Sequence, residues 1–167
     1  YNPQNKKYYI VQDFCEGEEL MDFIFDKQFT EYEIKLIMRQ IFLVIQYMHE
    51  KNVAHKDLKP ENIMFKNADD INSLKIIDFG ISQQVDKSGK MDYYKGTLDY
   101  MAPEIFKQKC DLKVDIWSLG VILYFMVCRE FPFTNKDDGP KEVVKNIEEG
   151  KYDFNYPEFD DASEECE

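Results

Sequence analysis

The chain has 167 residues, of which 44% are hydrophobic and 32% are charged, and its formal net charge is −12. This length and composition predict one soluble globular domain with a hydrophobic core of its own. The negative charge argues against a nucleic-acid backbone or an anionic membrane as partner. It is compatible with a basic peptide substrate, although an acidic surface also serves solubility alone.

The first predicted element is a strand over residues 8–11, where β-branched and aromatic residues follow one another. An acidic stretch that contains Gly17 follows and predicts a turn over residues 12–20. The next element is a long helix, because Thr30 and Glu33 have the spacing of a capping box and apolar residues recur at helical intervals as far as residues 51–52.

Three short motifs follow this helix in a fixed order. Residues 55–62 read His-Lys-Asp-Leu-Lys-Pro-Glu-Asn, residues 78–80 read Asp-Phe-Gly, and residues 102–104 read Ala-Pro-Glu. Two apolar runs, residues 63–65 and 74–77, lie between the first two motifs and predict a β-hairpin. An isolated Asp-Phe-Gly is an ordinary turn sequence. Here, however, three motifs occur in order, with an apolar helix before the first and an apolar strand before the second, and this combination indicates a single functional site.

From residue 80 to 102 the chain is polar and irregular. The longest apolar run, Val114–Cys128, contains Asp115, Ser118 and Gly120 and is too short to cross a membrane, so we expect a buried helix. We expect this helix to end before residues 131–133. A polar loop over residues 134–140 follows, and then a short stretch with helical periodicity over residues 142–147. The hydroxyl side chains of the irregular segment that we take as possible phosphorylation sites are Ser88, Tyr93 and Tyr94, besides Ser82 and Thr97.

Four cysteines are scattered along the chain without a Cys-x-x-Cys spacing, so no zinc site is expected. Together with a first segment that does not resemble a signal peptide, this predicts reduced thiols in an intracellular, cytoplasmic protein. The cysteines are Cys15, Cys110, Cys128 and Cys166.

The three motifs resemble the catalytic half of eukaryotic-type protein kinases. The resemblance implies an α+β, protein-kinase-like fold with a mainly α-helical C-lobe and short β-hairpins. The N-lobe is expected to be largely missing, because no Gly-x-Gly-x-x-Gly and no Val-Ala-x-Lys occurs. Residues 1–20 would then be the last N-lobe strand and the hinge, and residues 21–167 a C-lobe truncated before its final helices, so that this fragment alone would transfer phosphate poorly or not at all.

The resemblance also implies the catalytic roles. Asp57 would accept or orient the proton of a substrate hydroxyl, Lys59 would neutralise charge on the transferring phosphoryl group, and the Thr97 hydroxyl would bridge the two. Thr97 with Lys59 matches the serine/threonine type. Asn62 and Asp78 would bind Mg²⁺, the partner ion of ATP.

The binding residues come from the same resemblance. The backbone of Asp13 and Cys15 would contact adenine, and Gln12 would occupy the gatekeeper position. Met64 would face the adenine ring; the alternative is that it is an ordinary methionine of the core. Glu19 and Glu61 would face the peptide groove and select a basic residue before the phosphate acceptor, or are solvated side chains. The complete predicted binding set is Asp13, Cys15, Glu19, Glu61, Asn62, Met64 and Asp78.

Other residues of the motifs have expected structural roles. His55 could be a general base by residue type, but the resemblance favours a packed residue in contact with Phe79. Asp115 would brace the catalytic loop, residues 53–62, and the helix dipole alone also favours an acid there. The resemblance makes residues 80–102 the activation segment, and Lys56 stands where the family has an arginine that pairs with a phosphate on that segment. Lysine lacks the bidentate fork of arginine, so we expect limited dependence on phosphorylation of Ser88, Tyr93 or Tyr94. Glu104 would lack its family arginine partner.

Within the kinases, Glu-Gly-Glu-Glu-Leu at 16–20, Lys-Pro-Glu-Asn at 59–62 and Gly-Lys-Tyr-Asp-Phe at 150–154 are most similar to the calmodulin-dependent and calcium-dependent group. This leaves room for a calcium-sensing regulatory module outside the chain, and protein or peptide substrates with Ser or Thr are the expected partners. The alternative to an active ATP- and Mg²⁺-dependent kinase is a pseudokinase scaffold, against which the intact Asp57, Lys59, Asn62 and Asp78 argue.

Overall fold

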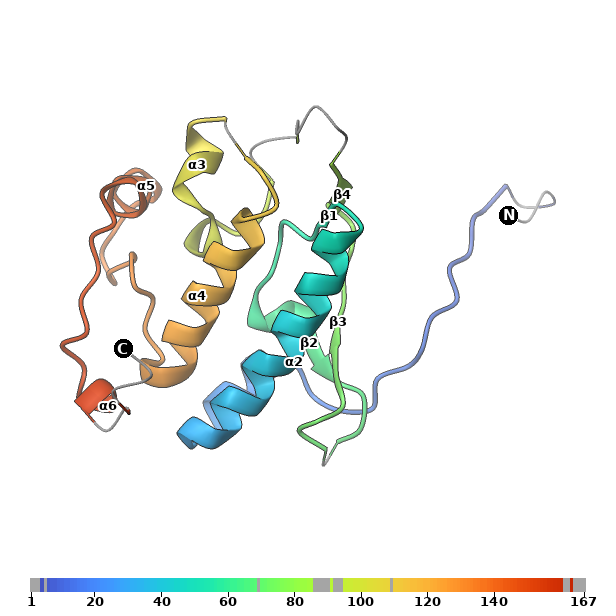
Figure 1. Cartoon of the computed structure of the whole chain (residues 1–167), viewed down its shortest axis with the longest axis horizontal. Helices are drawn as coiled ribbons and strands as arrows, with labels where there is room; N and C mark the ends of the chain where they lie inside the picture. The colour runs from blue at the N-terminus through green and yellow to red at the C-terminus, as the bar shows by residue number, and fades with distance from the viewer. Residues whose placement is uncertain are drawn as a thin grey trace.

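The molecule is a set of helices with two small antiparallel sheets (Figure 1). The computed structural model describes residues 4, 6–68, 70–85, 91, 95–108, 110–160 and 163. Its elements are α1 (Leu20–Asp26), α2 (Glu31–Glu50), β1 (Val53–Ala54), η1 (Pro60–Asn62), β2 (Ile63–Phe65), β3 (Leu74–Ile76), β4 (Gln83–Gln84), η2 (Leu98–Tyr100), α3 (Pro103–Phe106), α4 (Val114–Cys128), α5 (Pro140–Glu149) and α6 (Pro157–Asp160).

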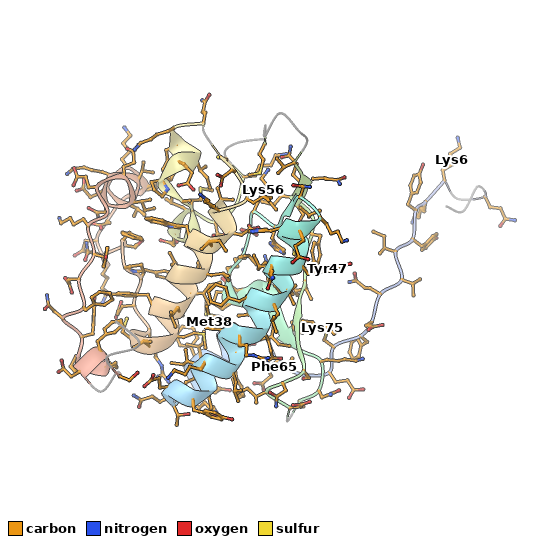
Figure 2. The ribbon with its side chains drawn as sticks, in the orientation of Figure 1. Lys6, Met38, Tyr47, Lys56, Phe65 and Lys75 are labelled. Carbon is orange, nitrogen blue, oxygen red and sulfur yellow. The ribbon has the colours of Figure 1, made fainter. Side chains whose placement is uncertain are left out.

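Helix α2 confirms the predicted capping box at its start. The Thr30 hydroxyl accepts the Glu33 N–H at 3.3 Å, and Glu33 Oε2 accepts the Thr30 N–H at 2.9 Å. One face of the helix is buried against the core and includes Ile37, Ile41 and Ile45, each 0% exposed. The opposite face is exposed, as Tyr47 illustrates in Figure 2.

Helix α4 is the central element of the core. It is apolar around most of its circumference and packs against α2, η2 and α6, so the expectation of a buried helix over Val114–Cys128 is confirmed. The helix ends where Arg129 adopts the left-handed conformation, with φ of 60°. Among the helices of the described residues, none has the length and apolar character that crossing a bilayer would need.

The predicted hairpin is present, since β2 and β3 pair antiparallel with Phe65 opposite Leu74. A second sheet consists of β1 and β4, which pair Ala54 with Gln83. This pairing ties the start of the catalytic loop to the chain that follows Asp-Phe-Gly. Neither of its two-residue strands was predicted, because segments this short carry no periodic signal.

The strand predicted over residues 8–11 is absent, and the chain there is irregular. In Figure 1 this segment runs away from the body of the molecule. Its large side chains are exposed, to 96% at Val11 and 88% at Ile10. A β-branched run favours a strand where its side chains can pack on a pleated, half-buried surface, and these side chains do not. Helix α1 was not predicted, and it begins at Leu20, the last residue of the predicted turn.

Candidate active site

The site is centred on the carboxylate of Asp57, whose two oxygens have different partners. Oδ1 accepts both the N–H and the hydroxyl of Thr97, each at 3.0 Å. Oδ2 lies 3.5 Å from Lys59 Nζ and accepts the Asn62 amide at 3.2 Å. Lys59 Nζ also donates to the Thr97 hydroxyl at 2.9 Å. The expected bridge by Thr97 between Asp57 and Lys59 is therefore present.

Asn62 closes the catalytic loop from its far end. Besides its contact with the Asp57 carboxylate, its amide nitrogen donates to the Asp57 carbonyl at 2.8 Å, and the side chain is nearly buried. Both amide hydrogens therefore point to Asp57, and Oδ1 is the atom left to face a ligand.

Asp115 holds the start of the catalytic loop from the first turn of α4. It is fully buried, and its carboxylate accepts the backbone N–H groups of His55 and Lys56, both at 2.9 Å. His49 Nε2 lies 2.9 Å from the same carboxylate. The expected bracing role of Asp115 is confirmed, while the contribution of His49 was not predicted.

His55 is a packed residue, as the resemblance implied. Its ring is fully buried and meets Phe79 edge-on, with 5.1 Å between ring centroids. Nε2 lies 3.1 Å from the carbonyl of Ile77, and Nδ1 accepts the Asp57 N–H at 3.3 Å. Both nitrogens are therefore used within the protein, and neither is available to act as a general base.

Asp78 follows the hairpin on the same side as Asn62. The Ile77 N–H donates to the Asn62 carbonyl at 2.9 Å, so the backbones that carry the two side chains are joined. Asp78 is exposed, has φ of 58°, and accepts the Gly80 N–H through Oδ1 at 3.0 Å. Among the described residues no three His, Cys, Asp or Glu side chains gather as a metal site.

The predicted hinge residues lie along one edge of β2. Glu16 and Gly17 donate their N–H groups to the carbonyls of Lys66 and Phe65, at 2.9 and 3.1 Å. Glu19 then pairs across an isolated bridge with Met64, which is half-buried. The structure therefore brings Met64 and the backbone of Glu19 together.

Two other predicted hinge residues lie farther along the same segment. Asp13 is exposed, with its carboxylate 3.9 Å from Lys66 Nζ, and Cys15 is partly exposed. The adenine contacts expected of their backbones remain predictions.

Glu61 stands beside Tyr100 on the other flank of the catalytic loop. Its Oε2 atom is buried and has no hydrogen-bond partner among the described residues, and the same holds for the Tyr100 hydroxyl. Burial, followed by the charge of Glu61, raises the pKa of Tyr100 above its ordinary value. A buried carboxylate oxygen without a donor is costly unless a cationic group reaches it.

Contacts between the catalytic loop and the region of β4 were also not predicted from the sequence. Lys56 Nζ donates to Gln83 Oε1 at 3.1 Å, which joins the catalytic loop to β4. Ser82 contributes next to it, because its hydroxyl donates to the His55 carbonyl at 3.2 Å. Ser88, Tyr93 and Tyr94 lie outside the described residues.

Glu104 is half-buried, and the expectation that it lacks its family arginine partner stays a prediction. Within the described part of the chain, no ion pair reaches Glu104. Cys15, Cys110 and Cys128 are free thiols, and Cys166 lies outside the described residues. Burial raises the pKa of the Cys110 and Cys128 thiols.

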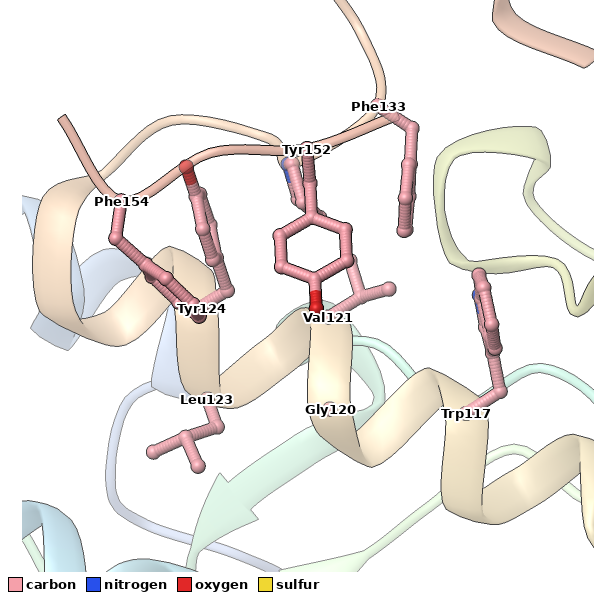
Figure 3. A pocket seen from close by; sticks show the side chains of 9 residues that line it. Trp117, Gly120, Val121, Leu123, Tyr124, Phe133, Tyr152 and Phe154 are labelled. Carbon is pink, nitrogen blue, oxygen red and sulfur yellow. The ribbon is translucent and has the colours of Figure 1, made fainter. Parts of the chain in front are cut away.

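An apolar pocket of about 310 Å³ lies on another face of α4 (Figure 3). Aromatic side chains from α4 and from the loops before and after α5 surround it, and Tyr152 extends toward α4 at Val121. None of its lining residues belongs to the predicted site. The lining residues are Trp117, Gly120, Val121, Leu123, Tyr124, Pro132, Phe133, Tyr152 and Phe154.

Among the known proteins to which the chain is similar are calcium-dependent protein kinases of Plasmodium. Calcium-dependent protein kinase 6 of Plasmodium berghei (strain Anka) is 50% identical over 150 residues, which is 89% of this chain and 10% of that protein. Calcium-dependent protein kinase 5 of the same organism is 41% identical over 151 residues, 90% of this chain and 26% of that protein. Calcium-dependent protein kinase 4 of Plasmodium falciparum (isolate 3D7) is 42% identical over 165 residues, 97% of this chain and 31% of that protein.

The chain thus spans between a tenth and a third of the length of these relatives. The model of the protein kinase domain matches residues 1–167, the whole chain. Together with the paired Asp57, Lys59 and Thr97, this match identifies the chain as a member of the protein kinase domain family.

Proposed function

We propose that the protein to which this chain belongs is a serine/threonine protein kinase that transfers the γ-phosphate of ATP to hydroxyl groups of protein substrates. The observation that carries the proposal is the Asp57 carboxylate, held by Thr97 and Asn62 beside the Lys59 ammonium. Family membership supports the fold and the chemistry. The substrates and the regulation of the whole protein are part of the same proposal.

The protein's own residues act on the attacking hydroxyl. The carboxylate of Asp57 accepts a hydrogen bond from the substrate hydroxyl and orients it. It takes the proton as the bond from the hydroxyl oxygen to the γ-phosphorus forms, while the bond from that phosphorus to the bridging oxygen breaks and ADP leaves. Thr97 and Asn62 fix the direction of both carboxylate oxygens, so little reorganisation is needed during the reaction. The Lys59 ammonium stabilises the negative charge of the phosphoryl group in transfer.

The residues present fit Mg²⁺ and ATP. Asn62 offers its Oδ1 atom because both amide hydrogens are used within the loop, and Asp78 offers an exposed carboxylate, so the donor set is the hard oxygen that Mg²⁺ prefers. Asn62 and Asp78 would hold the ion. When bound, Mg²⁺ supplies charge neutralisation to the triphosphate.

We further propose a preference for substrates with a basic residue before the phosphate acceptor. The buried Oε2 atom of Glu61, which has no donor among the described residues, and the adjacent Tyr100 hydroxyl would both accept from a guanidinium group. Glu19 would add a second carboxylate from the start of α1, which packs against η1, the turn that carries Glu61.

Calcium control through a regulatory module outside this chain is proposed from the names of the relatives. Limited dependence on phosphorylation of the activation segment is proposed because Lys56 replaces the family arginine. Free thiols at the described cysteines support the proposed cytoplasmic location.

The test is transfer of labelled γ-phosphate from ATP and Mg²⁺ by the full-length protein to matched Ser, Thr and Tyr peptides, with and without arginine before the acceptor. We expect transfer to the arginine-containing Ser and Thr peptides, and a loss on the order of 10²-fold or more in Asp57→Asn. Asp26→Asn, an exposed position at the end of α1, is the matched control and should keep full activity. A folded protein that binds ATP but does not transfer phosphate would instead support the alternative of a pseudokinase scaffold.

A further inference from the structure

Lys56 has an unusual backbone conformation directly before the catalytic aspartate. Its φ is 73°, in the left-handed region that residues other than glycine, asparagine and aspartate rarely adopt. Such a conformation persists only where neighbouring groups hold it. Because the peptide between Lys56 and Asp57 sets the direction in which the Asp57 side chain leaves the loop, whatever holds Lys56 also aims the carboxylate.

The backbone of Lys56 is held from two sides. Its N–H donates to the buried Asp115 carboxylate at 2.9 Å. Gly96 covers its carbonyl so closely that a Cβ atom there would lie 2.8 Å from the oxygen. These contacts restrain the main chain, while the side chain reaches Gln83 of β4. Figure 2 labels Lys56 near the C-terminal end of α2.

The side chain of Lys56 is hydrogen-bonded to Gln83, whose backbone is held in a β-sheet. Nζ donates to Gln83 Oε1 at 3.1 Å in a partly buried environment. Gln83 is paired with Ala54 in the sheet of β1 and β4, only two residues before Lys56. The lysine side chain therefore closes a small ring that runs through Ala54, the catalytic loop and Gln83.

We propose that Gln83 is a positioning residue for phosphoryl transfer. Its Oε1 atom holds the Lys56 side chain, and this contact stabilises the left-handed backbone from which Asp57 meets Thr97 and Lys59. Gln83 touches neither substrate nor nucleotide in this role and acts through Lys56. The inference rests on the proposed kinase activity, because its effect is on the rate of that reaction.

The experiment compares the full-length wild-type protein with a set of variants in the transfer assay. Gln83→Leu removes the acceptor at similar size, and Gln83→Glu keeps an acceptor at the same reach. Gln84→Leu is the matched control, since Gln84 is the exposed neighbour in the same strand and pairs with Val53. We expect kcat to fall about tenfold in Gln83→Leu with both KM values nearly unchanged, because the loop is misaimed and binding is not lost.

The other variants separate positioning from general stability. Gln83→Glu should restore kcat to within about threefold of the wild type, since a carboxylate accepts from the ammonium at least as well. Gln84→Leu should leave kcat unchanged. Lys56→Met should lower kcat at least as much as Gln83→Leu does, and the double variant should lose no more than Lys56→Met alone, since both changes break the contact that the two residues share.

The inference would be overturned if Gln83→Leu kept the kcat of Gln84→Leu, if its loss lay in KM alone, or if the double variant multiplied the two losses. Should Gln83→Leu unfold, Gln83→Asn replaces it, because the shorter amide cannot reach Lys56, and an unchanged kcat there has the same meaning. Inactive wild-type protein would overturn the proposed function and this inference together. Active wild-type protein with unaffected variants would overturn this inference alone.

Discussion

The catalytic loop, residues 53–62, and the segment over residues 8–17 differ in what holds them in place. The loop has little regular structure, yet its polar groups are matched to buried partners such as Asp115 and Asn62. The earlier segment has a stronger β-forming sequence, yet Val11 is 96% exposed, and backbone hydrogen bonds to the hairpin begin at Glu16. Satisfied buried hydrogen bonds can fix an irregular loop, whereas propensity does not fix a strand whose side chains remain in water.

The largest effect is expected from a substitution that disrupts the buried hydrogen bonds of the catalytic loop. In Asp115→Asn, one carboxylate oxygen becomes an amide nitrogen, so a buried N–H of His55 or Lys56 loses its acceptor and faces a donor. We expect a loss of about 3 kcal/mol in the free energy of unfolding. Denaturant titration measures it, with the m value checked for constancy.

The matched control for this change is Asp111→Asn. Asp111 is exposed and accepts one N–H, that of Lys113, at 2.7 Å. Its substitution should cost less than about 1 kcal/mol. Equal losses at Asp115 and Asp111 would show that burial of the network does not hold the loop.

The second prediction concerns the place where the hinge segment becomes fixed. A Cβ atom at Gly17 would lie 2.6 Å from the carbonyl oxygen and 2.7 Å from the Cβ atom of Phe65. Gly17→Ala must therefore push the segment away from β2, and we expect a loss of about 2 kcal/mol in the free energy of unfolding. Gly139→Ala is the control, because nothing lies within 4 Å of its added Cβ and its φ is −81°. The same small loss in both variants would contradict the close approach.

The third prediction tests the link between the loop and the activation segment. Thr97→Val keeps the shape of the side chain and removes the hydroxyl that joins Asp57 and Lys59. We expect kcat to fall about tenfold, equivalent to about 1.4 kcal/mol in the barrier. Thr97→Ser keeps the hydroxyl and should retain most of the rate. Steady-state kinetics of both variants decide, and an unaffected Thr97→Val enzyme would assign the bridge a structural role alone.

Most of the helical framework was predictable because its signals are local. The capping box at Thr30 and the apolar run of α4 depend on nearby residues, and both elements formed where expected. The constellation of Asp57, Lys59 and Thr97 was predictable from motifs that belong to one family. Its hydrogen-bond geometry is confirmed, while the catalytic roles stay proposals.

The unpredicted features depend on partners that are distant in sequence. The contact of Lys56 with Gln83 arises only because two strands of two residues each pair, and such strands are too short for a pattern. The exposure of Val11 depends on what surface is there to receive it, which propensity does not encode. Helix α1, which has seven residues, was also not predicted, because its first residue lies in the predicted turn over residues 12–20.

The smallest effect is expected at the start of α2, where the Glu33 carboxylate accepts hydrogen bonds from Lys27 and Thr30. The Lys27 ammonium, at 2.6 Å, and then the Thr30 N–H lower the pKa of Glu33 from 4.5 to about 2. The folded pKa lies below the unfolded one, so the stabilisation is complete above about pH 4.5 and is lost as the pH falls toward 2.

Glu33→Gln should therefore lower the free energy of unfolding by about 1 kcal/mol near neutral pH, a figure reduced for the partial exposure of the pair. Denaturant titrations from about pH 7 down to about pH 3 should show the gap to the wild type shrinking below about pH 4.5. The control is Glu142→Gln, because Glu142 also stands in the first turn of a helix and pairs with Lys145 at 3.0 Å, but without a capping box. Its effect should be a few tenths of a kcal/mol. A gap at Glu33 that stays constant with pH would mean that the shape of the side chain, and not its charge, caps the helix.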